Sequence, residues 1–191
     1  SETQTQFGTF LAAEKGYHCP AVRDKAWPTW WGGNGCINLH RVGSVELLLL
    51  ALDYFEHTAD EPELALTIVP LATAVMDWVR TFFGRNSSTG ELDVWPTQSL
   101  EGYQCRFPPT RDSCVSNDMP IVAGLHAVLP KLVHMATATE AGKRVVPAQA
   151  LAHWQQLLGV LPPLPVTTKT TQTVFTAAQF PLAPQASHSG S

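Results

Sequence analysis

The sequence of 191 residues predicts a mainly α-helical fold, in which helical hairpins form part of a larger toroid and only short segments are β-structure. Three observations support this fold class. Four segments between residues 43 and 160 have apolar residues in helical spacing or open with helix-starting residues. The gap between the first two segments is short, which is typical of an antiparallel helix pair. The stretch 167–180 is rich in Thr, Val and Phe and predicts one or two strands.

The first helix is expected from Gly43 to Thr58, with Ser44 as its N-cap. The body of this helix, Leu47 to Leu52, is apolar on nearly every side. A helix of this kind is buried from several directions, as an inner helix of a helical barrel would be. Because such a helix needs neighbours, we expect the natural protein to be longer than this chain.

The second helix is expected to begin at Asp60, its N-cap, and to run to about Phe83. Pro70 lies inside this segment and should kink or split the helix, since proline has no backbone N–H and clashes with the preceding turn. Gly84 is expected to close the helix as a C-cap.

A third helix is expected from Met119 to about Ala138, capped by Asn117 or Asp118 and bent at Pro130. A fourth opens at Pro147 and ends near Val160. We therefore treat residues 1–191 as one partial toroid domain. Its parts are an aromatic, glycine-rich loop region (1–41), the helical hairpins (42–160) and an extended C-terminal segment (161–191).

The bulk composition narrows the classes of function. Hydrophobic residues make up 45% and charged residues 15%, as in a folded globular protein. The net charge of −4 argues against a nucleic-acid partner. No apolar run approaches the roughly 20 residues of a membrane helix, so we expect no membrane insertion. Neither a metal-ligand spacing nor a cofactor fingerprint is present in the sequence, and we expect no metal and no cofactor.

Cysteine usage and one short motif favour a secreted or secretory-pathway glycoprotein. Two local disulfides, Cys19–Cys36 and Cys105–Cys114, are the simplest of three possible connectivities. The sequence Asn86-Ser87-Ser88 is an N-glycosylation acceptor in a predicted turn. Loop disulfides and an exposed acceptor asparagine both belong to an oxidising compartment. The alternative is that the thiols are reduced and the motif occurs by chance.

The stretch from Asp93 to Ala127 contains the candidate catalytic residue, Glu101. A proton-donating carboxyl group needs a partly desolvated setting to stay protonated near neutral pH, and Trp95 and Tyr103 are suited to supply it. The candidate sugar-binding residues are aromatic, amide and other polar side chains: Trp30, Trp31, Asn34, His40, Trp95, Gln98, Tyr103, Asn117 and Asp118. The alternative is that Glu101 is an ordinary solvated carboxylate and the tryptophans pack in the core.

Several segments, in this order and spacing, resemble the six-hairpin glycosidases, with relatives near family 95 of the glycoside hydrolases, the inverting α-L-fucosidase and α-L-galactosidase group. The segments are Gly43-Ser44-Val45-Glu46-Leu47, Leu52-Asp53-Tyr54-Phe55, His57-Thr58-Ala59-Asp60, Pro70-Leu71-Ala72, Thr89-Gly90-Glu91-Leu92, Trp95 to Tyr103 and Asn117 to Leu125. The resemblance covers about Trp30 to Val133 and implies an (α/α)6 barrel of twelve helices, of which this chain supplies four.

The resemblance also implies roles for two positions. Glu101 would be the general acid, and Asn117 or Asp118 would help to form the sugar site. Inverting hydrolysis needs a second carboxylate at roughly 6.5–9.5 Å from the first. In the family that residue comes from later in the chain, so this sequence resembles a fragment of the whole domain.

We therefore expect a glycoside hydrolase that cleaves an extracellular glycan by general acid/base catalysis, with a carbohydrate as substrate and the remainder of the toroid as its structural partner. Two alternatives stay open. One is a polysaccharide lyase, for which Tyr103, His40 and Arg41 are candidate groups. The other is a helical domain without catalytic activity that binds carbohydrate or packs against a partner.

Overall fold

The computed structural model describes residues 42–97, 99, 110–112, 114–169 and 172–178. The described part of the chain is mainly helical with short antiparallel strands, as the sequence predicts. Its elements are α2 (Gly43–Thr58), α3 (Glu61–Glu63), the π-helix η3 (Leu64–Ile68), α4 (Val69–Phe82), β1 (Gly84–Arg85), β2 (Leu92–Asp93), α5 (Met119–Ala138), α6 (Glu140–Val145), α7 (Ala148–Leu158), β3 (Val166–Lys169) and β4 (Gln172–Phe175).

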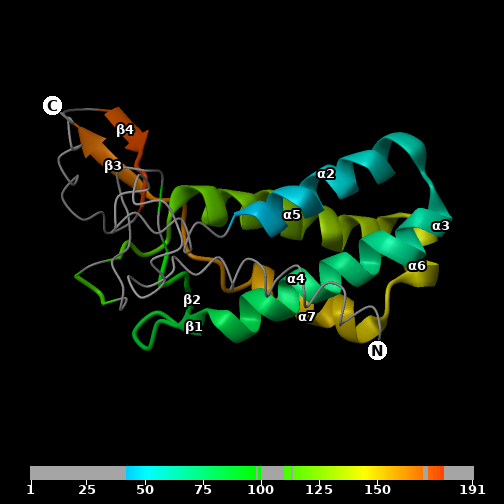
Figure 1. Ribbon diagram of the computed structural model, residues 1–191, viewed down its shortest axis with the longest axis horizontal. Helices are drawn as coiled ribbons and strands as arrows, with labels where there is room; N and C mark the ends of the chain where they lie inside the picture. The colour runs from blue at the N-terminus through cyan, green and yellow to red at the C-terminus, as the bar shows by residue number, and fades with distance from the viewer. Residues whose placement is uncertain (1–41, 98, 100–109, 113, 170–171, 179–191) are drawn as a thin grey trace, which may run out of the picture.

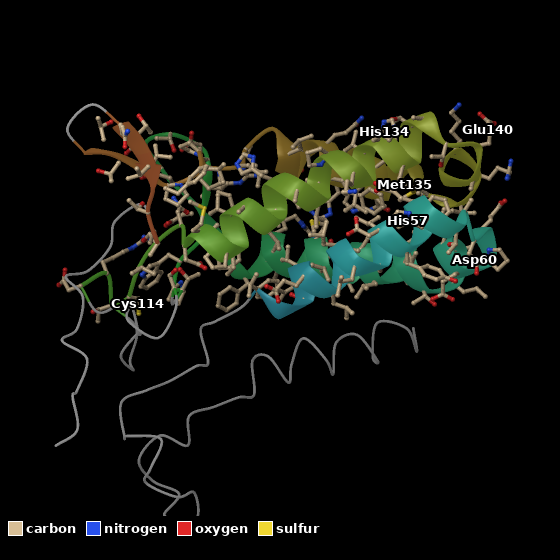
Figure 2. The ribbon with its side chains drawn as sticks, turned by 90° about the horizontal axis from the view of Figure 1, so that it is seen from above. His57, Asp60, Cys114, His134, Met135 and Glu140 are labelled. Atoms are coloured by element: carbon tan, nitrogen blue, oxygen red, sulfur yellow. The ribbon has the colours of Figure 1, made fainter. Side chains whose placement is uncertain are left out.

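The long helices lie along one axis, and the chain reverses direction between them (Figure 1). Helix α5 is central, because it packs against α2 on one side and against α7 on the other, while α4 contacts both α2 and α7. The short helices α3 and α6 lie at one end of the bundle, and both strand pairs lie at the other end. Figure 2 shows the same arrangement along the bundle, with Cys114 at the strand end and Asp60 and Glu140 at the opposite end.

Helix α2 has the predicted bounds, but only one face of it is buried. Val45, Leu48 and Leu52 are buried in the core, whereas Leu50 on the opposite face is 66% exposed. The prediction of burial on all sides is therefore wrong for the described structure. Ser44 is also not the cap: Val42 precedes the helix, and no side chain caps it by a hydrogen bond. Glycine at the first helical position places Ser44 inside the first turn.

The second predicted helix begins as expected but changes type before Pro70. The Asp60 side chain caps α3 by accepting a hydrogen bond from the Glu63 N–H at 3.0 Å. A π-helical turn then runs from Leu64 to Ile68, and its last bond joins the Val69 N–H to the Leu64 carbonyl. The wider turn accommodates the missing N–H and the ring of Pro70. Gly84 is not a C-cap, because Phe83 leaves the helix in an extended conformation and Gly84 starts β1.

Helix α5 is confirmed from Met119 to Ala138, with Pro120 in its first turn and Asp118 as its cap. Its apolar side chains fill the centre of the core; Leu125, Leu129 and Leu132 have no exposed surface. Burying one such side chain contributes about 1.5–3 kcal/mol to stability. At Gly124, a Cβ atom would lie 2.7 Å from Cγ1 of Val45, so glycine permits the close approach of α5 to α2.

The fourth predicted helix is α7, and the short helix α6 before it was not predicted. Thr139 starts α6 by accepting a hydrogen bond from the Gly142 N–H at 2.9 Å, and Arg144 joins α6 to α3 through Glu61. The predicted C-terminal strands form the hairpin β3–β4, in which Val166 pairs with Phe175. The bridge from Asp118 to Ala178 attaches this hairpin to the start of α5.

Within the described residues, two helices are long and apolar enough to cross a membrane, at Glu61–Phe82 and Met119–Ala138. Both supply buried side chains to the core, where the same composition is needed. Length and composition are therefore weak evidence for a membrane location, and the sequence expectation of no membrane insertion stays a prediction.

Candidate functional site

The candidate site lies at the strand end of the bundle, where α4 ends and α5 begins. Strands β1 and β2 pair as a hairpin, with Gly84 opposite Asp93 and Arg85 opposite Leu92. The Leu92 N–H also donates to the Val160 carbonyl at 2.7 Å, which ties the hairpin to the end of α7. The hairpin is thereby attached to the ends of both α4 and α7.

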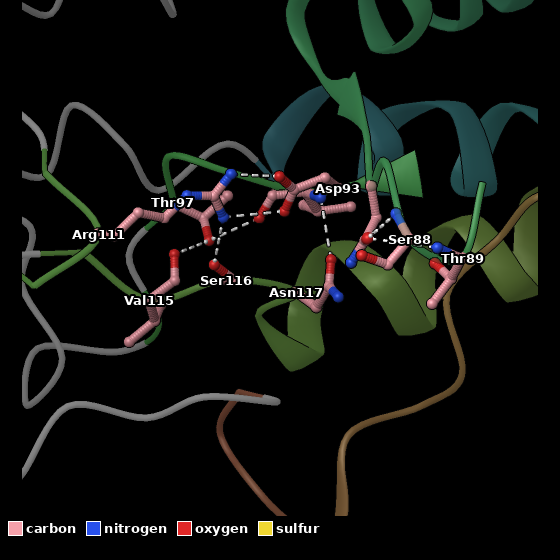
Figure 3. Close-up of polar contacts among 10 residues, drawn as sticks. Ser88, Thr89, Asp93, Thr97, Arg111, Val115, Ser116 and Asn117 are labelled. Atoms are coloured by element: carbon pink, nitrogen blue, oxygen red, sulfur yellow. Dashed lines mark hydrogen bonds and ion pairs between the residues drawn. The ribbon is translucent and has the colours of Figure 1, made fainter. Parts of the chain in front are cut away.

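Two loop segments meet directly after β2. The Val94 N–H donates to Oδ1 of Asn117, the Asn117 N–H donates to the Val94 carbonyl, and both distances are 2.9 Å. The Thr97 hydroxyl donates to the Val115 carbonyl at 3.1 Å, and the same two residues form a β-bridge. Residues 94–97 and 115–117 therefore form a connected polar framework, part of which Figure 3 shows.

Arg111 spans this framework. Its guanidinium donates to both carboxylate oxygens of Asp93 and to the Ser116 hydroxyl at 3.1 Å. The same group lies over the ring of Trp95, with 4.4 Å between Cζ and the ring centroid. Hydrogen bonding to Asp93 raises the pKa of Arg111 above its ordinary value. Arg111 is thus a fixed cation with three partners, although its side chain is largely exposed.

A polar pocket of about 230 Å³ opens beside this cation. Its walls come from the β1–β2 hairpin and from the loop before α5, and its lining residues are Arg85, Asn86, Ser87, Asp93, Arg111, Ser116 and Asn117. Guanidinium, amide, hydroxyl and carboxylate groups can all bind sugar hydroxyls by hydrogen bonds. The pocket is smaller than the cavities that hold drug-sized ligands, so its volume suits a single small polar ring.

Asp118 follows the pocket residue Asn117 in the chain and does not itself line the pocket. The side chain is 1% exposed, one of its oxygens has no hydrogen-bond partner, and the other accepts a long bond of 3.5 Å from the Ile121 N–H. Burial raises the pKa of Asp118 to about 7, against the opposing effect of the hydrogen bond from the Ile121 N–H. Asp118 therefore caps α5 as a carboxyl group that holds a proton up to near-neutral pH.

Of the sequence-predicted site residues, the structure describes Trp95, Asn117 and Asp118, and it brings them together within one loop framework. Asn117 lines the pocket, Trp95 is covered on one face by Arg111, and Asp118 is buried. The other candidates lie outside the described residues: Glu101, Trp30, Trp31, Asn34, His40, Gln98, Tyr103 and the lyase candidate Arg41.

Cys114 is buried and disulfide-bonded, and its partner also lies outside the described residues. The two predicted pairings, Cys19–Cys36 and Cys105–Cys114, therefore stay predictions. In the same described part of the chain, no group of three or more His, Cys, Asp or Glu side chains is placed to hold a metal ion.

Sequence reasoning missed the pocket residues Arg85, Asp93, Arg111 and Ser116, and it named Asn86 and Ser87 only as part of a glycosylation motif. Asp93 stands at the start of the stretch that the sequence singles out, and Arg111 lies within its cysteine-bracketed loop. The stretch also contains Glu101, Arg106, Asp112 and Asp118, so its charges alone do not single out the pair of Asp93 and Arg111. Arg85 has no sequence signal, because it enters the pocket only through the pairing of β1 with β2.

Comparisons with known proteins add no assignment: no protein-family model, no curated protein and no solved structure matches this chain.

Proposed function

We propose that this protein is a glycoside hydrolase, or a piece of one, that binds a sugar residue in the pocket beside Arg111 and cleaves a glycosidic bond by general acid/base catalysis. One observation carries the proposal: a sugar-sized pocket with both donors and acceptors lies on the framework that continues directly into the segment with Glu101. Sugar hydroxyl groups need donors and acceptors together, and this lining supplies both.

The roles of the residues follow from their contacts. Both carboxylate oxygens of Asp93 accept hydrogen bonds from Arg111, so Asp93 serves as a binding group and not as a proton donor. Glu101 is the proposed general acid, which protonates the leaving oxygen. The general base that activates water is proposed to come from elsewhere in a longer protein, because inversion requires a second carboxylate on the opposite side of the sugar ring.

The toroid is part of the same proposal. The exposed face of α2 presents Leu47, Leu50 and Tyr54 at helical spacing. Three large apolar side chains on one stripe support further helices packing on that face, as they would in a closed ring of helical hairpins. The partner at this surface is accordingly the remainder of the toroid.

Secretion remains in the proposal as well. Asn86 is exposed in the turn between β1 and β2 but also lines the pocket, so an N-linked glycan on it would compete with a sugar bound there, and glycosylation at Asn86 stays a sequence prediction. The disulfide of Cys114 supports an oxidising compartment.

A polysaccharide lyase is the second candidate, and one observation favours it. Two arginines line the pocket, and a lyase needs a cation that neutralises the uronate before proton abstraction. The two reactions differ in their products: a lyase makes an unsaturated uronide that absorbs ultraviolet light, and a hydrolase makes a new reducing end without that absorption.

The experiment measures release of reducing ends and ultraviolet absorption on a panel of neutral and acidic glycans, with the secreted protein extended to its natural length. We expect Glu101→Gln to lower the hydrolytic rate by about a hundredfold or more, as loss of a general acid does. Glu91→Gln is the matched control, because it removes a carboxylate from the β1–β2 hairpin outside the pocket lining. Equal rates for the wild type and Glu101→Gln on a cleaved glycan would remove Glu101 from this role.

A further inference from the structure

The charge of the pocket is not balanced. Its lining has two guanidinium groups, Arg85 and Arg111, and one carboxylate, Asp93. Asp93 is engaged by Arg111 through both of its oxygens. Arg85 donates to the Gly90 carbonyl at 3.3 Å and forms no ion pair with any residue that the structure describes. Among the residues that the structure describes, one full positive charge at the pocket wall therefore has no acidic partner.

This charge is local. The whole chain carries a net charge of −4, so a positive pocket is not a consequence of a generally basic protein. The other described arginines that pair with acids, Arg80 with Asp77 and Arg144 with Glu61, lie on helices outside the pocket. Arg85 also has a defined position, because β1 pairs with β2 and the Asn86 N–H donates to the Glu91 carbonyl at 2.8 Å.

The neighbours of Arg85 add hydrogen-bond donors. The Asn86 side-chain oxygen accepts bonds from the N–H groups of Ser88 (2.9 Å) and Thr89 (3.3 Å) within the turn. The Asn86 amide nitrogen and the Ser87 hydroxyl belong to residues that line the pocket, and the hydrogen bonds among the described residues leave both groups for a ligand. Donors gathered around an unpaired guanidinium match a ligand with negative charge and surrounding hydroxyl groups.

We infer that the pocket binds an acidic sugar residue, with Arg85 contacting its carboxylate or sulfate group and with Asn86 and Ser87 contacting neighbouring hydroxyls. This inference rests on the proposed function and names its substrate class, an anionic glycan. The guanidinium fork binds a planar carboxylate through two parallel hydrogen bonds, and it binds a sulfate through the same donors. Charge also makes the interaction dependent on ionic strength.

The test is calorimetric titration of the full chain at low and at high salt. The ligands are oligosaccharides of uronic acid, the same oligosaccharides with each carboxyl group reduced to an alcohol, and sulfated oligosaccharides of a neutral sugar. We expect the acidic ligands to bind about tenfold or more tightly than the reduced ones, since a hydrogen bond to a charged group contributes on that order. Preference between the carboxylate and the sulfate series identifies the acidic group.

Variants test whether Arg85 causes the preference for acidic ligands. Arg85→Gln should weaken the acidic ligand by about tenfold and leave the reduced ligand unchanged. Arg85→Lys should keep the salt dependence but bind the carboxylate less tightly, because an ammonium group has no bidentate fork. Arg80→Gln removes the same charge from α4, outside the pocket, and should change neither affinity.

Two results would overturn the inference. Equal affinity for acidic and reduced ligands, together with no effect of Arg85→Gln, contradicts the substrate class but leaves a glycan site in place. No binding of any glycan, with a folded protein shown by its thermal unfolding, contradicts the proposed function as well.

Discussion

Val94 and Asn117 are joined by two hydrogen bonds of 2.9 Å, one from each backbone N–H, and Asn117 holds a positive φ of 49° to make them. The Asn117 side chain accepts the Val94 N–H, and its own N–H reaches the Val94 carbonyl. This pair closes the framework around the pocket, because it fixes the residue after β2 to the residue before the Asp118 cap of α5.

Asn117→Ala should destabilise the protein by about 2–4 kcal/mol. Alanine removes the acceptor of a buried N–H and is disfavoured at a positive φ. Equilibrium unfolding in urea measures the loss. Asn117→Gly is the matched control, since glycine tolerates this backbone conformation, and it should recover about 1 kcal/mol of the loss. Alanine and glycine variants of equal stability would contradict a contribution from the backbone conformation.

The pair Asp93 and Arg111 should show a coupling free energy of about 1 kcal/mol in a double-mutant cycle built from Asp93→Asn and Arg111→Gln. The two-pronged geometry and the additional bond to Ser116 place it at the upper end for a partly exposed ion pair. Salt should reduce this coupling. The control is Asp77 with Arg80, a pair at 3.6 Å on the surface of α4, for which we expect a smaller value. Equal coupling in the two cycles would refute a special role for the pocket pair.

Asp118 should make stability fall as pH rises toward neutrality. Its folded-state pKa of about 7 exceeds the unfolded value near 3.8, so between these two pKa values the folded state holds the extra proton. The contribution is therefore complete below about pH 4 and lost as pH passes 7, and at 1.36 kcal/mol per pKa unit it amounts to about 4 kcal/mol.

Asp118→Asn tests this pH dependence, because asparagine is an equally good N-cap and cannot ionise. Unfolding in urea at pH 4, 6 and 8 should show the wild type losing stability relative to the variant as pH increases. The difference between the two proteins removes the effect of every other titrating group. A constant difference over this range would show that Asp118 does not titrate in it.

Gly142→Ala should cost about 2 kcal/mol or more. A Cβ atom at this position would lie 2.0 Å from the Met135 carbonyl oxygen and 2.8 Å from the Thr139 hydroxyl, so the turn between α5 and α6 must move. Thermal unfolding measures the effect. At Gly159 a Cβ atom would meet only ordinary contacts of 3.6 Å or more, so Gly159→Ala should leave the melting temperature unchanged or raise it.

The helices were predictable where the signal is local. Asp60 and Asp118 cap helices because their short carboxylates reach the N–H groups three residues ahead, and this pattern is visible in the sequence. Gly84 was assigned wrongly because the chain leaves α4 at Phe83 and pairs as β1, and Ser44 was assigned wrongly because α2 already begins at Gly43. The open face of α2 was missed because an apolar sequence does not state which neighbours are present.

The residues of the candidate site were likewise predictable only where the signal is local. Asn117 was identified because it precedes a predictable helix. Asp93 and Arg111 are separated by seventeen residues, and Arg85 reaches the pocket through the hairpin, so their meeting depends on tertiary structure. Only a folded arrangement reveals that Arg111 is paired with an acid while Arg85 has no ion pair among the described residues.

The two pocket walls are attached to helices that are distant in sequence, since the β1–β2 hairpin directly follows α4 and the loop of the other wall directly precedes α5. A molecule that contacts both walls therefore connects the segment that follows α4 to the segment that precedes α5. Any such compound should raise the melting temperature, because it stabilises the folded state by an amount that grows with the logarithm of its concentration above the dissociation constant, about 2.7 kcal/mol at a hundred times that constant. A thermal-shift screen can therefore search sugar libraries before any reaction has been observed.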